Sequence, residues 1–149
     1  MIAIACDHAG VDLKPHVLAV LDELGLEYKD FGTNSHKSVD YPVYGLKAAK
    51  AVSSGECALG IIICGTGIGI GMAASKVKGI RCATVTDTYS AKMSRLHNNA
   101  NMLSLGSRVL GSELCKDIVS MFVMTAFEGE RHARRVGMIE AIENGESIE

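Results

Sequence analysis

The chain has 149 residues, nearly half of them apolar, and a formal net charge of −2 at neutral pH. A chain of this length is expected to fold as one domain that buries roughly 68–70% of its unfolded surface, so it needs no stabilising crosslinks. The near-neutral charge offers no basic field for nucleic acid, and the absence of tryptophan removes a common base-stacking group. We therefore expect a small ligand.

The first third of the chain predicts an alternation of strand and helix. Ile2 to Ala5 is a short apolar run typical of a buried strand. Gly10 to Leu24 is predicted to be a helix that ends at Gly25. One face of it carries Val11, Val17, Leu18, Leu21 and Leu24. A strand over Glu27 to Phe31 and a helix over Pro42 to Val52 follow.

The remaining chain continues the alternation. The expected strands are Leu59 to Cys64, Arg81 to Thr86 and Met102 to Leu105. The expected helices are Ile68 to Val77, Asp87 to His97, Ser112 to Thr125 and Glu130 to Asn144. The pattern predicts a single α/β domain over residues 1–149, with a three-layer, Rossmann-like fold. Its five-stranded parallel sheet carries helices on both faces.

Reactive residue types follow several of these strands. Asp7 and His8 follow the first strand, Cys64 ends the third, and Thr86 and Asp87 end the fourth. His97 and Asn98 close the helix that leads to the fifth strand. Because ligands of such folds bind beyond the carboxyl ends of the strands, we expect these side chains to share one rim. A simple helix-capping role remains an alternative for Asp7 and His8.

The most informative segment runs from Leu59 to Gly71, where an apolar strand enters a cysteine and a glycine-spaced turn. Glycines let a ligand approach the backbone amides closely. The following helix would direct its N-terminus toward Cys64, which favours a thiolate. The alternative is that Cys64 is a small core residue.

The spacing of this turn differs from that of nucleotide-binding loops. The sixth position of a dinucleotide G-x-G-x-x-G pattern is Ile70 or Met72, and no Lys-Ser/Thr pair follows to form a phosphate-binding loop. The sequence therefore argues against bound NAD or ATP.

The cysteines and the hydropathy pattern bear on location. Five cysteines without a C-x-x-C pair predict neither a disulfide framework nor a zinc knuckle, which fits a reducing cytoplasm. The apolar run at the amino terminus stops at Asp7, so we expect no signal peptide, and no segment is long enough to span a membrane.

Two arginines near the carboxyl terminus, Arg131 and Arg135, lie four residues apart on a predicted helix and so share one face. The arginine fork suits phosphate. The competing interpretation is a solvated face on which they pair with Glu128 and Glu130.

Six short segments, spread over almost the whole chain, carry a family resemblance. They are Asp7-His8-Ala9-Gly10, Asp40-Tyr41-Pro42, Cys64-Gly65-Thr66-Gly67-Ile68-Gly69, Ser94-Arg95-Leu96-His97-Asn98, Gly106-Ser107-Arg108 and Glu128-Gly129-Glu130-Arg131-His132. In this order they resemble the type B ribose-5-phosphate isomerases. That family also includes galactose-6-phosphate and allose-6-phosphate isomerases.

The resemblance implies an aldose–ketose isomerase of the pentose phosphate pathway, with no metal and no organic cofactor. D-Ribose 5-phosphate and D-ribulose 5-phosphate would interconvert through a cis-enediolate. Cys64 would move the proton between C2 and C1, His97 would assist ring opening, and Thr66 would add a hydroxyl beside the developing oxyanion. Tyr41 would line the pocket.

The resemblance also implies how the substrate is held. The substrate-binding residues would be Asp7, His8, Gly65, Gly67, Ile68, Gly69, Asn98, Arg108, Arg131 and Arg135. The C-terminal helix, over about 130–144, would reach a neighbouring subunit, so a homodimer with shared active sites is expected and a tetramer stays open. Neither nucleic acid nor a membrane is an expected partner.

Two positions depart from the pattern of this family. Some members use a glutamate a few residues after the cysteine position as the base, but Ile70 stands in that place here, which leaves Cys64 as the base on this loop. Asn99 stands where many relatives carry aspartate, and losing that carboxylate would alter how His97 is oriented.

Two other classes of function compete with catalysis. A noncatalytic sugar-phosphate sensor would be expected to lose Cys64 or His97, and both are present. A flavodoxin-like nucleotide binder would share the sheet but would explain neither the cysteine nor the two arginines. The preferred sugar stays open, because the deciding pocket wall is expected to come from Ser35 to Val39 or from a partner chain.

Overall fold

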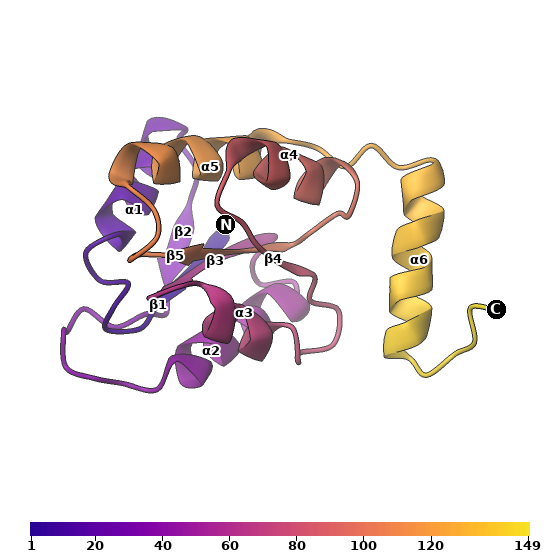
Figure 1. The fold of residues 1–149 in the computed structure, drawn as a ribbon, viewed down its shortest axis with the longest axis horizontal. Helices are drawn as coiled ribbons and strands as arrows, with labels where there is room; N and C mark the ends of the chain where they lie inside the picture. Colours follow the sequence, from indigo (N-terminus) through magenta and orange to yellow (C-terminus); the bar gives the residue numbers. More distant parts are fainter.

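The computed structural model describes residues 1–149 as three layers (Figure 1). The strands are β1 (Ile2–Cys6), β2 (Tyr28–Asp30), β3 (Leu59–Cys64), β4 (Cys82–Thr84) and β5 (Met102–Gly106). The helices are α1 (Lys14–Glu23), α2 (Tyr41–Ser53), α3 (Ile68–Ala74), α4 (Thr88–Leu96), α5 (Ser112–Met124) and α6 (Arg131–Glu143). The expected order of elements is confirmed.

The five strands form one parallel sheet in the order β2-β1-β3-β5-β4. The chain moves outward from β1 to β2 and then crosses back to β3 on the other side of β1. The point where the order reverses therefore lies between β1 and β3. Ligands of doubly wound sheets bind beyond the carboxyl ends of the strands at such a point.

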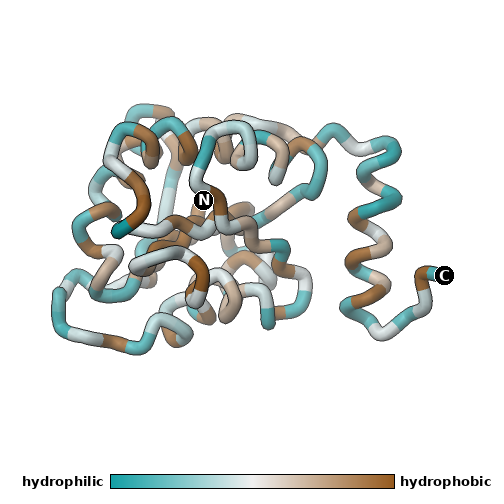
Figure 2. The backbone as a smooth tube through the Cα atoms, in the orientation of Figure 1, coloured by the Kyte–Doolittle hydropathy of each residue, from teal (hydrophilic) through white to brown (hydrophobic).

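Alternation along the strands builds a core on each face of the sheet. Ile4 and Ile61 face α1 and α5, while Ala5 and Ile62 face α2 and α3, as expected for side chains of period two. Figure 1 shows α1, α4 and α5 on one side and α2 and α3 on the other. Figure 2 shows hydrophobic residues along the central strands, consistent with a sheet buried on both faces.

The first helix begins later than predicted from Gly10. Residues 8–13 form turns, and α1 starts at Lys14 with Pro15 in its first turn, where the missing N–H costs nothing. The buried Asp7 carboxylate stabilises the turns by accepting hydrogen bonds from the amides of Ala9 (2.9 Å) and Gly10 (3.2 Å). The helical spacing was therefore correct only from the proline onward.

Helix α6 stands at one end of the molecule, beside the three layers rather than within them (Figure 1). It is tied to the segment before β4 by Arg81, which pairs with Glu140 at 3.3 Å, and by the amide of Gly79, which donates to Glu143. Ile139 and Ile142 on this helix are exposed. No helix of the chain has both the length and the apolar composition that crossing a bilayer requires.

Candidate active site

The loop after β3 places the Cys64 sulfur at the point where the strand order reverses. Cys64 is only 5% exposed, and its Sγ accepts a hydrogen bond from the amide of Gly67 at 3.2 Å. Gly67 has φ of +79°, and its carbonyl accepts a hydrogen bond from the buried hydroxyl of Ser104. The loop is thus held in one shape, with an N–H group aimed at the sulfur.

Several amides of this loop have no acceptor within the chain. Gly65, Thr66, Gly69 and Ile70 donate no hydrogen bond from their backbone N–H groups. The Oγ1 atom of Thr66 accepts a hydrogen bond from the amide of Ile68 at 3.2 Å, and both of these residues are exposed. Unpaired N–H groups beside a sulfur form a site suited to an oxygen anion.

The glycine at position 67 is required by the backbone. An added Cβ would lie 2.9 Å from the backbone of Leu105, and positive φ is itself strained for an L side chain. We expect Gly67→Ala to destabilise the fold by about 2–4 kcal/mol, measured by urea unfolding. Gly111→Ala is the matched control, because Gly111 has φ of −72° and open space around it, and it should cost no more than about 1 kcal/mol. Equal stability of the two variants would contradict this account of the loop.

The other cysteines are poor candidates for a base. Burial raises the pKa of Cys6 and of Cys115 to about 11 and that of Cys82 to about 12. All five cysteines are free. Cys64 packs in the core between the sheet and helices α2 and α3, and among the five cysteines it alone combines a strand end with a hydrogen bond accepted from an amide.

The residues after β1 lie next to this loop. Asp7 N–H donates to the carbonyl of Ile63, which ties the two strand ends together at 3.1 Å. The Nδ1 atom of His8 accepts from the amide of Val39 at 3.1 Å, so in the neutral ring Nε2 carries the proton. His8 is therefore able to donate a hydrogen bond toward an anion, while Asp7 serves as a cap in this state.

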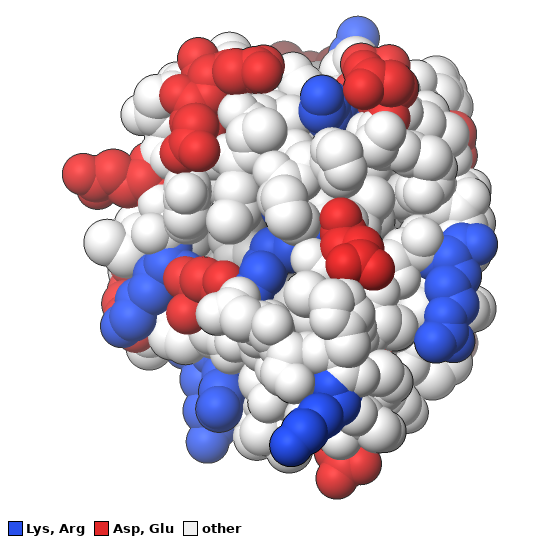
Figure 3. Space-filling view, turned by 90° about the vertical axis from the view of Figure 1, so that its left-hand side faces the viewer, with Lys and Arg blue, Asp and Glu red and all other residues white.

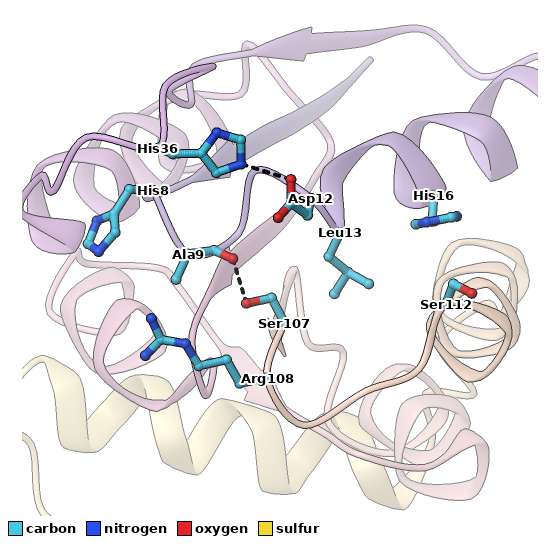
Figure 4. A pocket seen from close by; sticks show the side chains of 9 residues that line it. All are labelled: His8, Ala9, Asp12, Leu13, His16, His36, Ser107, Arg108 and Ser112. Carbon is cyan, nitrogen blue, oxygen red and sulfur yellow. Dashed lines mark hydrogen bonds and ion pairs between the residues drawn. The ribbon is translucent and has the colours of Figure 1, made fainter.

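A cavity of about 520 Å³ opens beside the turn after β1 and is rich in potential cations. Its lining includes His8, Asp12, His16, His36 and Arg108. Figure 4 shows His8 and Arg108 at one end and His16 at the other, with the 2.8 Å pair of Asp12 and His36 across the opening. Figure 3 views this edge and shows scattered basic and acidic groups on a largely uncharged surface. Such a cavity fits one anionic group better than an extended polyanion.

Arg108 and Tyr41 approach the loop from two sides. The amide of Arg108 donates to the carbonyl of Gly65 at 3.0 Å, and its side chain packs over that glycine. The ring of Tyr41, in the first turn of α2, leaves no room for a Cβ at Gly69. The structure thus brings together Cys64 and its loop with Asp7, His8, Arg108 and Tyr41.

His97 belongs to a second cluster, at the end of α4. Its ring stacks on that of His132 with centroids 4.1 Å apart and an angle of 11° between the planes. Glu128 Oε2 lies 3.4 Å from Nε2 of His132 and 3.9 Å from Nε2 of His97. Burial lowers the pKa of His132, helped by the neighbouring His97 and Arg131 and opposed by Glu128.

The C-terminal arginines lie near this second cluster. Arg131 and Arg135 are exposed on α6, and neither forms an ion pair with Glu128 or Glu130. The paired-face interpretation is therefore wrong for these two acids. Asn98 lines a hollow between the body and α6.

The two clusters lie at opposite edges of the sheet, so the expectation that His97 and Asn98 share the rim of Cys64 is wrong within one chain. Cys64 pairs with Gly106 at the carboxyl end of β5, whereas His97 lies before Met102, at the amino end. The strand between them spans about 13 Å at about 3.3 Å per residue. In Figure 1 the carboxyl edge lies at the left, and α6 stands beyond the amino edge at the right.

Glu128 and His132 are the site residues that sequence reasoning missed as partners of His97. They lie four residues apart across the start of α6, a spacing that brings side chains together on a helix. That spacing was visible in the sequence. The contact with His97 was not, because it depends on the path of the chain after α5.

The fold and the first cluster define a class: an α/β protein with a cysteine and free backbone amides at the point where the strand order reverses, an arrangement suited to a small anionic ligand. The model of the Ribose/Galactose Isomerase family matches residues 2–139. Ribose-5-phosphate isomerase B of Escherichia coli is 49% identical over 142 residues, 95% of each chain. A structure of ribose-5-phosphate isomerase B from Clostridium thermocellum aligns with a TM-score of 0.94 at 53% identity and covers 97% of each chain.

A further relative extends the range of sugars. A galactose-6-phosphate isomerase subunit of Clostridium acetobutylicum is 38% identical, over 97% of this chain and 84% of its own length. The chain belongs to the ribose/galactose isomerase family.

Proposed function

We propose that this protein interconverts D-ribose 5-phosphate and D-ribulose 5-phosphate in the pentose phosphate pathway. The observation that carries the proposal is the Cys64 sulfur beside four unpaired amides where the strand order reverses. An aldose–ketose isomerase needs a base that moves a proton between adjacent carbons and donors for the oxyanion that forms. The identity of the sugar phosphate is inferred from the names of the relatives.

In the proposed reaction Cys64, as thiolate, removes the proton from C2 and returns it at C1. The enediolate oxygen would accept hydrogen bonds from the free amides of Gly65, Thr66 and Gly69, in fixed directions that cost no reorganisation. The Thr66 hydroxyl lies at the same turn. Every step uses groups of the protein, so we propose that catalysis needs no metal ion and no organic cofactor.

Phosphate recognition would fix the substrate over this loop. His8 and Arg108 line the cavity of the same chain, and the guanidinium of Arg108 lies beside Gly65. Arg131 and Arg135 are free of ion pairs and so available to an anion. Binding energy from the phosphate positions C1 and C2 against the base.

We propose a homodimer because one chain cannot bring His97 to Cys64. If the amino edge of one chain packs against the carboxyl edge of its partner, two-fold symmetry repeats the same contact with the roles of the chains exchanged, so the dimer has two complete sites. His97 of the partner subunit would then assist ring opening, with Asn98 of the partner subunit holding the reacting end of the sugar. The C-terminal helix, with its exposed Ile139 and Ile142, would accompany them. The free cysteines fit a cytoplasmic location.

The experiment that tests sugar-phosphate recognition compares Arg135→Ala with Arg134→Ala. Both are exposed arginines of α6, and Arg134 contacts only Met138 through its guanidinium. We expect Arg135→Ala to raise KM for ribose 5-phosphate by about 10-fold or more, because charge-assisted hydrogen bonds are worth about 1.5–3 kcal/mol. Arg134→Ala should stay near the parent value. An unchanged KM for Arg135→Ala would favour a solvated face without a phosphate role.

A further inference from the structure

Three potential metal-binding side chains converge at the amino edge, away from the Cys64 loop. One ligand atom from each of His97, Glu128 and His132 lies within 4.8 Å of the other two. The Nε2 atom of His132 is buried and has no hydrogen-bond partner, and its side chain is only 7% exposed. A buried polar atom without a partner is costly, so this nitrogen is a favourable position for a ligand atom or ion to bind.

The donor set and its spacing suit a borderline divalent cation. Two imidazoles and one carboxylate are typical ligands of zinc, at about 2.0–2.2 Å in a tetrahedral arrangement, which places neighbouring donors about 3.3 Å apart. Nε2 of His132 already lies 3.4 Å from Glu128 Oε2, and Nε2 of His97 lies 3.9 Å from it. The donor atoms of His132 and Glu128 are thus close to the required separation, whereas the donor atom of His97 lies slightly too far from that of Glu128.

The two histidines differ in how freely they can move. His132 is buried and its Nε2 atom has no hydrogen-bond partner, so packing holds its ring in place beside Glu128. His97 has a side chain that is 36% exposed, so its ring can turn from the stacked position until its lone pair meets the cation. His132 therefore forms the fixed part of the site, while Glu128, whose side chain is 41% exposed, can adjust together with His97.

The charge around the cluster limits the affinity. Arg131 and Arg135 both act on the His132 ring through their positive charge, and they oppose a second cation in the same place. An anion bound to these arginines would relieve that repulsion, whereas the bare cluster should bind the metal reversibly and not as a permanent structural ion.

We propose that His97, Glu128 and His132 form a reversible site for a zinc-like divalent cation, and that its occupation inhibits isomerisation. The inhibition rests on the proposed function, in which His97 assists ring opening. A metal on Nε2 of His97 occupies the lone pair that would exchange a proton with the sugar. The cation therefore acts as an inhibitor of a metal-independent reaction.

Binding is tested on the full chain without substrate, in a phosphate-free buffer. Zn²⁺ is titrated in competition with a chromogenic chelator, and the absorption of added Co²⁺ reports the ligands. We expect one ion per chain, a Co²⁺ spectrum without thiolate charge-transfer bands, and at least about tenfold weaker binding by His132→Asn and Glu128→Gln. Glu130→Gln removes a carboxylate two residues away and should bind as the parent does.

The outcomes separate this inference from the proposed function. Equal Zn²⁺ binding by the parent and His132→Asn, absence of stoichiometric binding, or thiolate bands in the Co²⁺ spectrum would each overturn the site, whatever the activity. In active protein we expect Zn²⁺ to inhibit the parent and to inhibit Glu128→Gln only at about tenfold higher concentration. Binding at the cluster without inhibition would overturn the regulatory part, and a parent without isomerase activity would overturn the proposed function while the binding result still decides the site.

Discussion

Replacing Cys64 by alanine should lower turnover of ribose 5-phosphate by about 10²–10⁴-fold, while the affinity for the substrate is largely retained. The reason is that the sulfur is the group that accepts the C2 proton, whereas the free amides and the phosphate-binding side chains stay in place. The measurement is steady-state kinetics of ketose formation by the purified variant.

The matched control for this variant is Cys82→Ala. Cys82 lies at the start of β4 and takes no part in the proposed chemistry. It should retain turnover close to that of the parent, so a general effect of losing a thiol is distinguished from loss of the base. Near-normal turnover by Cys64→Ala would show that another group removes the proton.

Mixing two inactive variants should restore activity. In a dimer with shared sites, a chain carrying Cys64→Ala and a partner carrying His97→Asn leave one of the two sites intact. Random exchange makes half of the dimers mixed, so about a quarter of the parent activity should return. Each variant alone should remain inactive, and the activity should appear only after the subunits have exchanged.

The result is specific to the placement of His97 at the edge opposite Cys64. If one chain supplied both groups, each site of a mixed dimer would still lack one of them, and mixing would restore nothing. The control mixes two preparations that both carry Cys64→Ala. No dimer in that mixture contains an intact site, so no activity should return.

The sequence predicted the elements well where local physics decides them. The apolar runs of β1 and β3 and the helical spacing of α2 and α5 lie within a few residues of their expected bounds. Residues 10–13 were predicted as helix because Val11 fits the helical spacing, but hydrogen bonds from two amides to Asp7 favour turns, and α1 begins only at Lys14, with Pro15 in its first turn. Competition between a side-chain cap and a helix is difficult to resolve from spacing alone.

The site residues that directly follow a strand could be predicted. Those whose position depends on the path of the chain between α5 and α6 could not. Cys64 ends β3 and Asp7 directly follows β1, so a parallel sheet brings them to one edge. His97 ends a helix that runs against the strands, which places it at the other edge, and this direction was overlooked. Its contacts with Glu128 and His132 depend on the path after α5, for which the sequence carries no local signal.

The most direct test of the proposed function is the isomerisation of ribose 5-phosphate, allose 6-phosphate and galactose 6-phosphate by the purified, metal-stripped protein, measured as ketose formed. We expect the pentose phosphate to turn over fastest, and removal of metal ions to leave the rate undiminished. A preference for either hexose phosphate would assign a sister activity of the same family. Binding of all three sugar phosphates without turnover would contradict the catalytic role of Cys64 and indicate a sugar-phosphate sensor.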